Sequence, residues 1–345
     1  MYYQSPNPHG GDVPDNIQYD FSVNTNPLGP SPAALAAARG ALEHMDRYPD
    51  PRCRGLVRAI AEYEGVPERW VLCGSGAAEL IYACCAALRP AAAMELSPTF
   101  SEYAAAMELW GGAMERCPLS PEAGFLPDAG FPAAVEGSGA RVLFLCSPNN
   151  PTGRLLPPET AEALLQTCAR RGIRLFVDEC FLDLAGGEGM KRHLGAFPGL
   201  FILKAFTKTY GMAGLRLGYG LCADEALLEA MARRTPPWNV SSAAQAAGIA
   251  ALGDREYLER ARALIAAERP RLRAALEAAG LRVWPSEANF LLLRGPEALG
   301  AALRARGFAL RDCANFPGLG PGWYRCAVRT GEENDALARA VSEVL

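Results

Sequence analysis

Five short runs that are apolar along most of their length constrain the fold of this chain most. They fall at residues 70–76, 92–98, 140–153, 173–181 and 200–208, and each ends at glycines or runs into a turn. Segments with helical spacing lie between them, such as the amphipathic stretch 157–172. Strands that lack polar alternation are buried on both faces, and strands that alternate with helices form mainly parallel sheets. The sequence therefore predicts an α/β fold whose mostly parallel sheet is covered by helices on both faces.

The chain divides around this predicted sheet into three regions. Residues 1–30 are rich in Pro, Gly and Asn and predict an extended arm rather than a core element. Residues 31–240 contain the sheet and form the predicted large domain. Residues 241–345 start with an Ala- and Arg-rich helical stretch and continue as a smaller α+β domain. A chain of 345 residues is long enough for two such domains that share a cleft.

Composition excludes several classes of function. A net charge of −4 gives no electrostatic reason to expect nucleic acid or an anionic membrane as a partner. The opening residues lack the pattern of a secretory signal, and no apolar stretch reaches the roughly 20 residues of a membrane span. Eleven cysteines without a Cys-x-x-Cys pair, and only three histidines, predict neither a disulfide framework nor a metal site. We expect a reduced, cytoplasmic protein, in which Cys84 and Cys85 have no role that the sequence indicates.

Two turns at the ends of predicted strands have the composition of ligand-binding turns. The turn "CGSGAAE" places the backbone N–H groups of Gly76, Ala77 and Ala78 at the start of a helix, where they suit a phosphate. The turn "SPNNPTG" at 147–153 places Asn150 beside a turn-forming proline and glycine. The alternative for each, taken alone, is an ordinary turn, since glycine-rich turns between a strand and a helix are common.

Charged side chains follow two further strands. Asp178 and Glu179 end the apolar run "FVDECF", where burying an aspartate costs several kcal/mol unless a cation meets it. Lys208 and Arg216 lie in "KAFTKTYGMAGLRLGYG", with small residues and no other charge between them. The alternative for the carboxylates is a helix N-cap or a structural ion pair. Because ligands bind at the carboxyl ends of strands in open α/β sheets, we expect these groups to share one site.

Together the four strand ends predict one ligand with a phosphate, a cationic nitrogen and an aldehyde. Pyridoxal 5′-phosphate carries all three groups. A lysine binds its aldehyde covalently, and a carboxylate keeps its ring nitrogen protonated. An arginine and a helix N-terminus neutralise its phosphate.

The motifs "SPNNPTG", "VDECF", "FTKTYGMAGLRLGY" and "WYRCAVR" resemble those of the fold-type I pyridoxal-phosphate enzymes related to aspartate aminotransferase. The motifs "NPLGP" and "RYPD" are similar to those of the histidinol-phosphate aminotransferase branch. The segments "HGG", "DFSVNTNPLG", "PPWNVS" and "RDCANFPGLGPGWYRCAVR" most resemble the threonine-phosphate decarboxylases of cobalamin biosynthesis. The resemblance runs nearly end to end, and its last block is the most specific part.

This resemblance implies the residues that hold the cofactor. Lys208 would carry it covalently and Asp178 would pair with its ring nitrogen, and these two residues would be catalytic. Tyr48 would reach the cofactor phosphate of a partner subunit, which implies a homodimer with shared active sites. The implied cofactor-binding residues are Tyr48, Gly76, Ala77, Ala78, Phe100, Asn150, Asp178, Thr207, Lys208 and Arg216.

The resemblance also implies the substrate and the reaction. The implied substrate-binding residues are His9, Gly10, Asn24, Asn150, Arg311 and Arg325. Arg325 would bind the substrate carboxylate, and the arm and Arg311 would hold a substrate phosphate. The implied reaction is decarboxylation of O-phospho-L-threonine to (R)-1-aminopropan-2-yl phosphate. The alternatives are a histidinol-phosphate aminotransferase and a non-catalytic protein that binds pyridoxal phosphate.

Three departures from the wider family pattern bear on these alternatives. Phe181 stands where the aminotransferases have a tyrosine that hydrogen-bonds the cofactor. The decarboxylases also have phenylalanine at this position, so this departure favours the decarboxylase branch. Ala205 replaces a Ser or Thr that contacts the cofactor phosphate, which leaves Thr207 or a water to substitute. Ala77 and Ala78 replace polar residues and leave only backbone donors in their turn.

Overall fold

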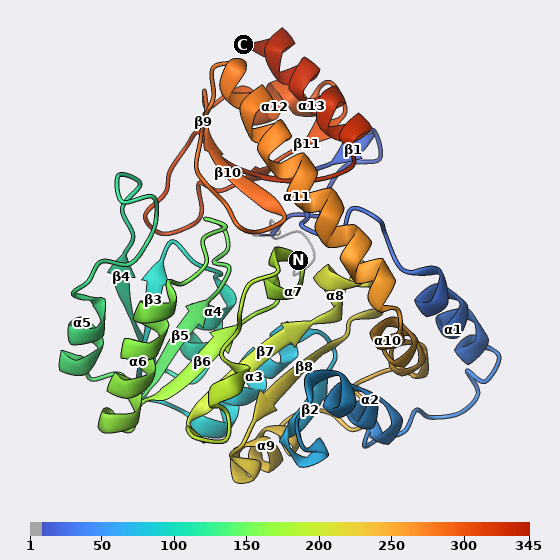
Figure 1. Cartoon of the computed structure of the whole chain (residues 1–345), viewed down its shortest axis with the longest axis vertical. Coiled ribbons are helices and arrows are strands. Elements are labelled where there is room, and N and C mark those ends of the chain that lie inside the picture. The colour runs from blue at the N-terminus through green and yellow to red at the C-terminus, as the bar shows by residue number, and fades with distance from the viewer. Residues whose placement is uncertain (1–8) are drawn as a thin grey trace.

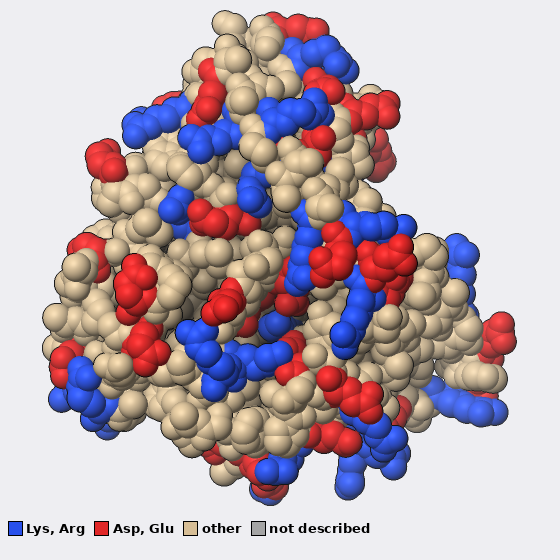
Figure 2. Space-filling model, viewed as in Figure 1, with Lys and Arg blue, Asp and Glu red and all other residues tan. Residues whose placement is uncertain are grey.

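The computed structural model describes residues 9–345, so the part of the predicted arm at 1–8 lies outside the described residues. Figure 1 shows one region built on a large sheet and a second region, with the C-terminus, above it. The long helix α11 (Arg255–Ala278) runs from the first region into the second. In the same view, Figure 2 shows the surface hollowed between the two regions, with charged side chains around the hollow. We propose that these regions are the large and small domains, with borders near residues 30 and 240.

The larger sheet has seven strands in the order β2-β8-β7-β6-β5-β3-β4. Its strands are β2 (Val71–Gly74), β3 (Ala92–Ser97), β4 (Ala113–Pro118), β5 (Val142–Cys146), β6 (Arg174–Asp178), β7 (Leu200–Ala205) and β8 (Gly218–Cys222). Neighbouring strands from β4 to β7 pair in parallel, whereas β8 runs antiparallel to both β7 and β2. The predicted α/β fold with a mostly parallel sheet is confirmed.

Alternation of side chains along each strand builds a core on both faces of this sheet. On β5, Leu143 and Leu145 pack into one hydrophobic cluster, whereas Val142 and Phe144 pack into another. The first cluster includes side chains from α5 (Phe131–Gly137) and α6 (Pro158–Arg171). The second includes side chains from α3 (Ala77–Leu88) and α4 (Glu102–Glu108), which lie behind the sheet in Figure 1. The apolar runs are therefore strands with two buried faces.

Two strands of this sheet, β4 and β8, lack the apolar pattern that predicts the others. Strand β4 lies at the sheet edge, and four of its six residues, including the charged Glu115 and Arg116, are exposed, so its sequence lacks an apolar strand pattern. Strand β8 contains Gly218 and Gly220, which weaken a strand signal. A Cβ on Gly218 would lie 2.6 Å from the backbone nitrogen of Ala77, so this strand and the start of α3 can approach only at a glycine.

The remaining α-helices connect the strands and flank the sheets. They are α1 (Pro32–Leu42), α2 (Arg54–Glu64), α7 (Leu182–Ala185), α8 (Phe206–Thr209), α9 (Glu225–Ala232), α10 (Ser242–Gly253), α12 (Leu299–Arg304) and α13 (Gly331–Val344). Among residues 9–345, no helix combines the length and hydropathy needed to cross a membrane. All eleven cysteines are free thiols, and Cys84 and Cys85 lie on α3 with their side chains buried in the core.

The second region contains a four-stranded antiparallel sheet in the order β12-β13-β10-β9. Its strands are β9 (Arg282–Val283), β10 (Phe290–Arg294), β12 (Arg311–Asp312) and β13 (Trp323–Ala327). Strand β1 (Tyr19–Asp20) of the arm pairs in parallel with β11 (Phe308–Ala309). Phe21 is fully buried in the core of this region. The expectation that the arm lies outside the core is therefore wrong for this segment, because its apolar side chain fills a core that residues far along the chain create.

Candidate active site

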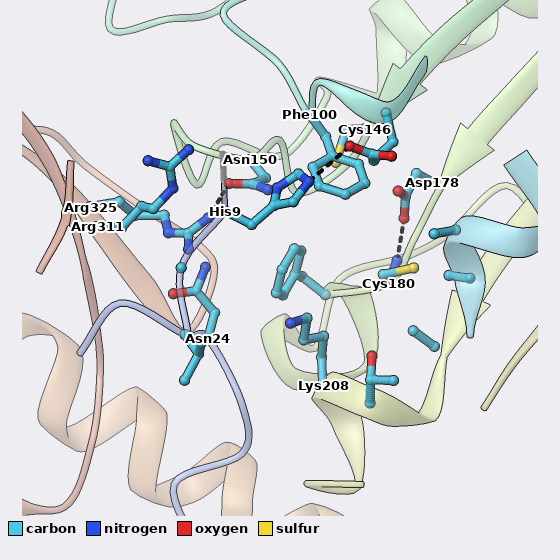
Figure 3. A pocket seen from close by; sticks show the side chains of 18 of the residues that line it. His9, Asn24, Phe100, Cys146, Asn150, Asp178, Cys180, Lys208, Arg311 and Arg325 are labelled. Carbon is cyan, nitrogen blue, oxygen red and sulfur yellow. Dashed lines mark hydrogen bonds and ion pairs between the residues drawn. The ribbon is translucent and has the colours of Figure 1, made fainter. Parts of the chain in front are cut away.

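A cavity of about 450 Å³ brings together nearly all the predicted site residues. The predicted residues that line it are His9, Gly10, Asn24, Ala77, Ala78, Phe100, Asn150, Asp178, Thr207, Lys208, Arg216, Arg311 and Arg325. Gly76 and Tyr48 are not among the lining residues. Figure 3 shows the arm, the ends of the large sheet's strands and the four-stranded sheet all contributing side chains to this cavity. Segments far apart in the sequence therefore converge on one site.

Strand register explains why the predicted chemistry converges. Cys146 at the end of β5 lies opposite Asp178 at the end of β6, and Asp178 lies opposite Leu203 near the end of β7. Asn150 follows β5 within a few residues, and Lys208 lies in the short helix α8 directly after β7. Because these strands are parallel and end at the same level in the register, the residues that follow each strand meet at one edge of the sheet.

Asp178 is buried, and hydrogen bonds satisfy both of its carboxylate oxygens. The Tyr103 hydroxyl donates to Oδ2 at 2.6 Å, and the Cys180 backbone N–H donates to Oδ1 at 2.9 Å. Burial raises the pKa of Asp178, whereas these hydrogen bonds and the nearby Lys208 act to lower it. The compensation that a buried carboxylate requires thus comes chiefly from neutral donors, with the cation of Lys208 in addition.

Lys208 extends into the same cavity as Asp178 (Figure 3). Burial and the nearby cations Arg325 and Arg216 lower the pKa of Lys208 to about 8, against the opposing effect of Asp178. With a pKa of about 8, roughly a tenth of the amine is neutral at pH 7, far more than for an ordinary lysine, and the neutral amine is the nucleophilic form. The site therefore prepares Lys208 to attack an aldehyde.

The lowered pKa predicts how the cofactor-free protein responds to pH. The unfolded chain holds the Lys208 proton up to its ordinary pKa of 10.5, whereas the folded chain releases it near 8. The unfolded state therefore binds more protons between these values, and stability rises with pH through that window. We expect Lys208→Met to stabilise the cofactor-free protein at pH 7 by on the order of 2 kcal/mol, and by much less at pH 10.5. Denaturant unfolding of both proteins at each pH measures the difference, and an equal effect at both pH values would contradict it.

Arg216 and the start of α3 form the part of the cavity suited to a phosphate. Arg216 has a left-handed backbone, with φ of 55°, and its Nη1 donates to the Ala213 carbonyl at 3.2 Å. Gly76 caps α3 with φ of 84°, and a Cβ there would lie 2.5 Å from the Arg216 Nη2. Gly76 thus lies behind the guanidinium instead of in the cavity wall. Its predicted cofactor contact stays a prediction, while its absent side chain is what allows Arg216 to approach α3.

Arg325 and Asn150 form a buried polar pair on the opposite side of the cavity. Arg325 lies on β13, and its Nη1 donates to the Asn150 side-chain oxygen while its Nη2 donates to the Ser22 carbonyl at 2.8 Å. Its Nε is buried and has no hydrogen-bond partner among the described residues. Burial lowers the pKa of Arg325 to about 10, so the side chain is cationic at neutral pH. An anion in the cavity would satisfy this buried cation.

Arg311 adds a second cation to this side of the cavity. It lies on β12 directly opposite Arg325 in the strand register. Its Nη2 donates to the side-chain oxygen of Asn315 at 2.8 Å, and its guanidinium lies 5.1 Å from the centre of the Phe316 ring. Two arginines on adjacent strands therefore border one cavity.

The arm contributes His9, Gly10 and Asn24 to the cavity lining, and Figure 3 shows His9 and Asn24. The His9 ring donates to Glu102 at 2.8 Å, and the Tyr82 hydroxyl donates to the other oxygen of Glu102 at 2.7 Å. These hydrogen bonds lower the pKa of Glu102, with the larger effect from His9. Asn24 is almost fully buried, and neither polar atom of its side chain has a hydrogen-bond partner among the described residues. An unpartnered buried amide costs free energy unless a ligand completes it.

Tyr48 lies away from the cavity on the surface. Its side chain is 79% exposed and stacks on Trp238, with 4.5 Å between the ring centres. The predicted contact across a subunit interface requires a second chain, so it stays a prediction. Within one chain, Tyr48 does not contribute to the site.

The chain is similar to known proteins along nearly its whole length. The model of the aminotransferase class I and II family matches residues 16–341. The chain belongs to this family. It is 35% identical to the threonine-phosphate decarboxylase of Salmonella typhimurium, over 98% of this chain and 96% of that protein. It is also 39% identical to a histidinol-phosphate aminotransferase of Roseiflexus castenholzii, over 94% of this chain and 89% of that protein.

A solved structure supports the same assignment. The structure of histidinol-phosphate aminotransferase from Sinorhizobium meliloti in complex with pyridoxal 5′-phosphate matches with a TM-score of 0.80 and 25% identity. The match covers 95% of this chain and 91% of that chain. As a member of the class I and II family, the chain is a pyridoxal 5′-phosphate-dependent enzyme with the fold-type I architecture.

The described residues fit this cofactor. The buried carboxylate of Asp178 suits the ring nitrogen, the amine of Lys208 suits the aldehyde, and Arg216 at the start of α3 suits the phosphate. Two departures noted in the sequence also line the cavity. Phe181 packs edge-on against Phe290 and has no hydroxyl to offer, and Ala205 leaves Thr207 as the neighbouring hydroxyl.

Sequence reasoning missed Glu102 and Tyr103, which contact predicted site residues directly. Both follow Phe100 in "SPTFSEY" and lie in the first turn of α4. A glutamate and a tyrosine in a helix are common, and only their partners His9 and Asp178 mark them as part of the site. The available signal was their closeness in sequence to Phe100, which the resemblance had already placed on the cofactor ring.

Proposed function

We propose that this enzyme decarboxylates O-phospho-L-threonine to (R)-1-aminopropan-2-yl phosphate, a building block of cobalamin. The observation that carries this proposal is the pair of arginines Arg311 and Arg325, which lie opposite each other on adjacent strands and both line the cavity. Two cations on one side of a cavity suit a small substrate with two anionic groups. Phosphothreonine has a carboxylate and a phosphate in one molecule.

Each residue then has a specific task. The bound cofactor supplies an electron sink for the bond that breaks at the substrate Cα. Arg325 holds the carboxylate, and Arg311, Asn24 and His9 hold the phosphate. Lys208 would pass to Cα one proton taken up from solvent, in place of the carboxylate that leaves as carbon dioxide, so that the product is an amine and the reaction consumes one proton. Asp178 keeps its negative charge beside the cofactor ring nitrogen throughout.

Histidinol-phosphate aminotransferase is the second candidate, because a relative with that name is 39% identical to this chain. Its substrate also carries a phosphate, and an amino acid cosubstrate would place a carboxylate at Arg325. The phenyl ring of Phe181 favours the decarboxylase, since the resemblance places a hydrogen-bonding tyrosine there in the aminotransferases.

The products distinguish the two activities. The holoenzyme is incubated with O-phospho-L-threonine, with O-phospho-L-serine, and with histidinol phosphate plus 2-oxoglutarate, while carbon dioxide and glutamate are both measured. We expect carbon dioxide from phosphothreonine in equal amount to the amine phosphate. Glutamate from histidinol phosphate, without carbon dioxide from either phosphoamino acid, would overturn the proposal in favour of the aminotransferase.

Loss of Arg311 is expected to weaken substrate binding. In Arg311→Gln, the missing charge-assisted hydrogen bonds should lower kcat/KM by roughly 10- to 100-fold, mainly through KM. The visible spectrum of the holoenzyme should stay unchanged, because this residue contacts the substrate and not the cofactor. Arg304→Gln on the exposed face of α12 is the matched control. Steady-state kinetics with phosphothreonine measure the effect, and an unchanged KM would remove Arg311 from the substrate site.

We further propose that the enzyme acts in the cytoplasm as a homodimer with shared active sites. Large apolar side chains are exposed on and near α1 and α10, which pack against each other. They include Leu42, Met45, Tyr48, Trp238 and Ile249. Clusters of exposed apolar residues are typical of subunit interfaces. An interface there would cover Tyr48 and bring it towards a partner subunit.

A further inference from the structure

We propose that Tyr103 is a positioning residue of this active site, which fixes one oxygen of the Asp178 carboxylate through a buried hydroxyl. The inference rests on the proposed pairing of Asp178 with the cofactor ring nitrogen. It does not depend on whether the enzyme decarboxylates its substrate or transfers an amino group.

The contact joins two distant parts of the large region. Tyr103 lies in α4, behind the sheet, and Asp178 ends β6, 75 residues later in the chain. The 2.6 Å hydrogen bond between them is short, as expected for a hydroxyl that donates to a carboxylate. The Cys180 backbone N–H occupies the other oxygen. Two donors from different directions therefore fix the orientation of the carboxylate.

Aromatic packing determines where the Tyr103 hydroxyl points. The Tyr103 ring is fully buried and stacks on Phe144, with 5.3 Å between the ring centres. It also lies 6.4 Å from the Phe176 ring and meets Phe100 edge-on at 5.7 Å. A ring held on these sides cannot swing its hydroxyl away from Asp178 without repacking the core.

Towards Asp178 the Tyr103 hydroxyl acts as the donor. Burial and the neighbouring Asp178 carboxylate raise the pKa of Tyr103 well above its ordinary value, so the phenol keeps its proton. Burial alone would favour the neutral acid form of Asp178, and the Tyr103 and Cys180 hydrogen bonds favour the ionised form. Only the ionised form can balance a protonated ring nitrogen.

Tyr103 also supports a second predicted cofactor contact. Its ring edge packs against Phe100, which the resemblance places on the face of the cofactor ring. Tyr103 thus contacts both Asp178, which we propose pairs with the ring nitrogen, and Phe100, which we propose packs on the ring face. Neither of these contacts involves the substrate.

Tyr103→Phe tests the proposal with little change in shape. The phenylalanine keeps the packing and removes only the hydroxyl, so Oδ2 of Asp178 loses its donor. We expect the cofactor dissociation constant, measured by dialysis of the holoenzyme, to rise about tenfold or more. We also expect kcat to fall while KM for the substrate changes less than about twofold, because Tyr103 acts through the cofactor. The pH dependence of the visible spectrum should shift as well.

The control is Tyr324→Phe, which removes another tyrosine hydroxyl. Tyr324 neighbours Arg325 on β13 but does not line the cavity, because consecutive side chains on a strand point to opposite faces. The Tyr324 hydroxyl donates to the Glu297 carbonyl at 2.7 Å in the second region. This variant should change thermal stability only. If Tyr103→Phe likewise loses stability but keeps wild-type cofactor affinity, kcat and spectral pH profile, Tyr103 is merely structural and the inference is overturned.

A double-mutant cycle tests separately whether Tyr103 acts through Asp178 and whether Asp178 has its proposed role. If Tyr103 acts through Asp178, Tyr103→Phe should have little further effect on cofactor affinity in an Asp178→Asn background. Fully additive effects would overturn the proposed route through Asp178. An Asp178→Asn variant with wild-type cofactor affinity and spectrum would instead overturn the role of Asp178 itself.

Discussion

Lys208→Ala is expected to abolish turnover and to leave the purified protein without the yellow colour of the bound cofactor. Among the described residues that line the cavity, Lys208 is the only amine, so no neighbour can replace it. Loss of a group that both binds the cofactor and moves a proton should lower kcat by at least about 10²–10⁴-fold. Steady-state carbon dioxide release from phosphothreonine, together with the visible spectrum, measures both consequences.

Two further variants test whether the loss is specific to the amine of Lys208. Lys208→Arg keeps the positive charge but cannot form the same covalent bond, so it should fail as the alanine variant does. Lys191→Ala removes a lysine outside the cavity, one that pairs with Glu64 at 2.9 Å, and should remain yellow and active. An active Lys208→Ala enzyme would remove this lysine from the proposed mechanism.

Asp178→Asn is expected to cause the second largest loss. The amide has the shape of the carboxylate but no charge to balance the cofactor ring nitrogen, so kcat should fall by about 10²-fold or more. The fold should persist, because an amide is easier to bury than a carboxylate. Single-turnover measurements with phosphothreonine would isolate the chemical step.

The neighbouring Glu179 provides a matched control for Asp178. Glu179 is also buried at the end of β6, but it lines a second cavity, where it accepts a hydrogen bond from the Met190 backbone N–H at 2.7 Å. Burial raises the pKa of Glu179 to about 7, so this carboxyl is about half ionised at pH 7 and Glu179→Gln removes part of a buried charge outside the active-site cavity. If both variants lost kcat equally, the special role of Asp178 would be contradicted.

The sequence predicts that Asp178 and Glu179 end a strand, but it does not show which of the two faces the active-site cavity. The apolar run "FVDECF" predicted two carboxylates at a strand end, and the structure confirms both positions. Consecutive residues point to opposite sides of a strand, so only one of them can face a given cavity. Glu179 fits the structural alternative, near the buried Lys204, whose pKa it raises. Asp178 faces the cavity that contains Lys208.

The large sheet and the converging strand ends were predictable because burial leaves a strong pattern in local sequence. Contacts between distant segments leave no such pattern. The pairing of Tyr103 with Asp178 spans 75 residues, and that of His9 with Glu102 spans 93. The burial of Phe21 depends on a core built almost entirely from residues beyond 270. These features depend on the packing of the finished fold.

The central claim is that Lys208 holds the cofactor covalently in the cavity that also contains Asp178 and Arg325. Borohydride reduction of the yellow holoenzyme makes such a bond permanent, and mass spectrometry of its peptides locates it. We predict the added mass of reduced pyridoxal phosphate on Lys208, at close to one per chain. A modified lysine elsewhere with Lys208 unmodified, or no modified peptide from a yellow sample, would contradict the account.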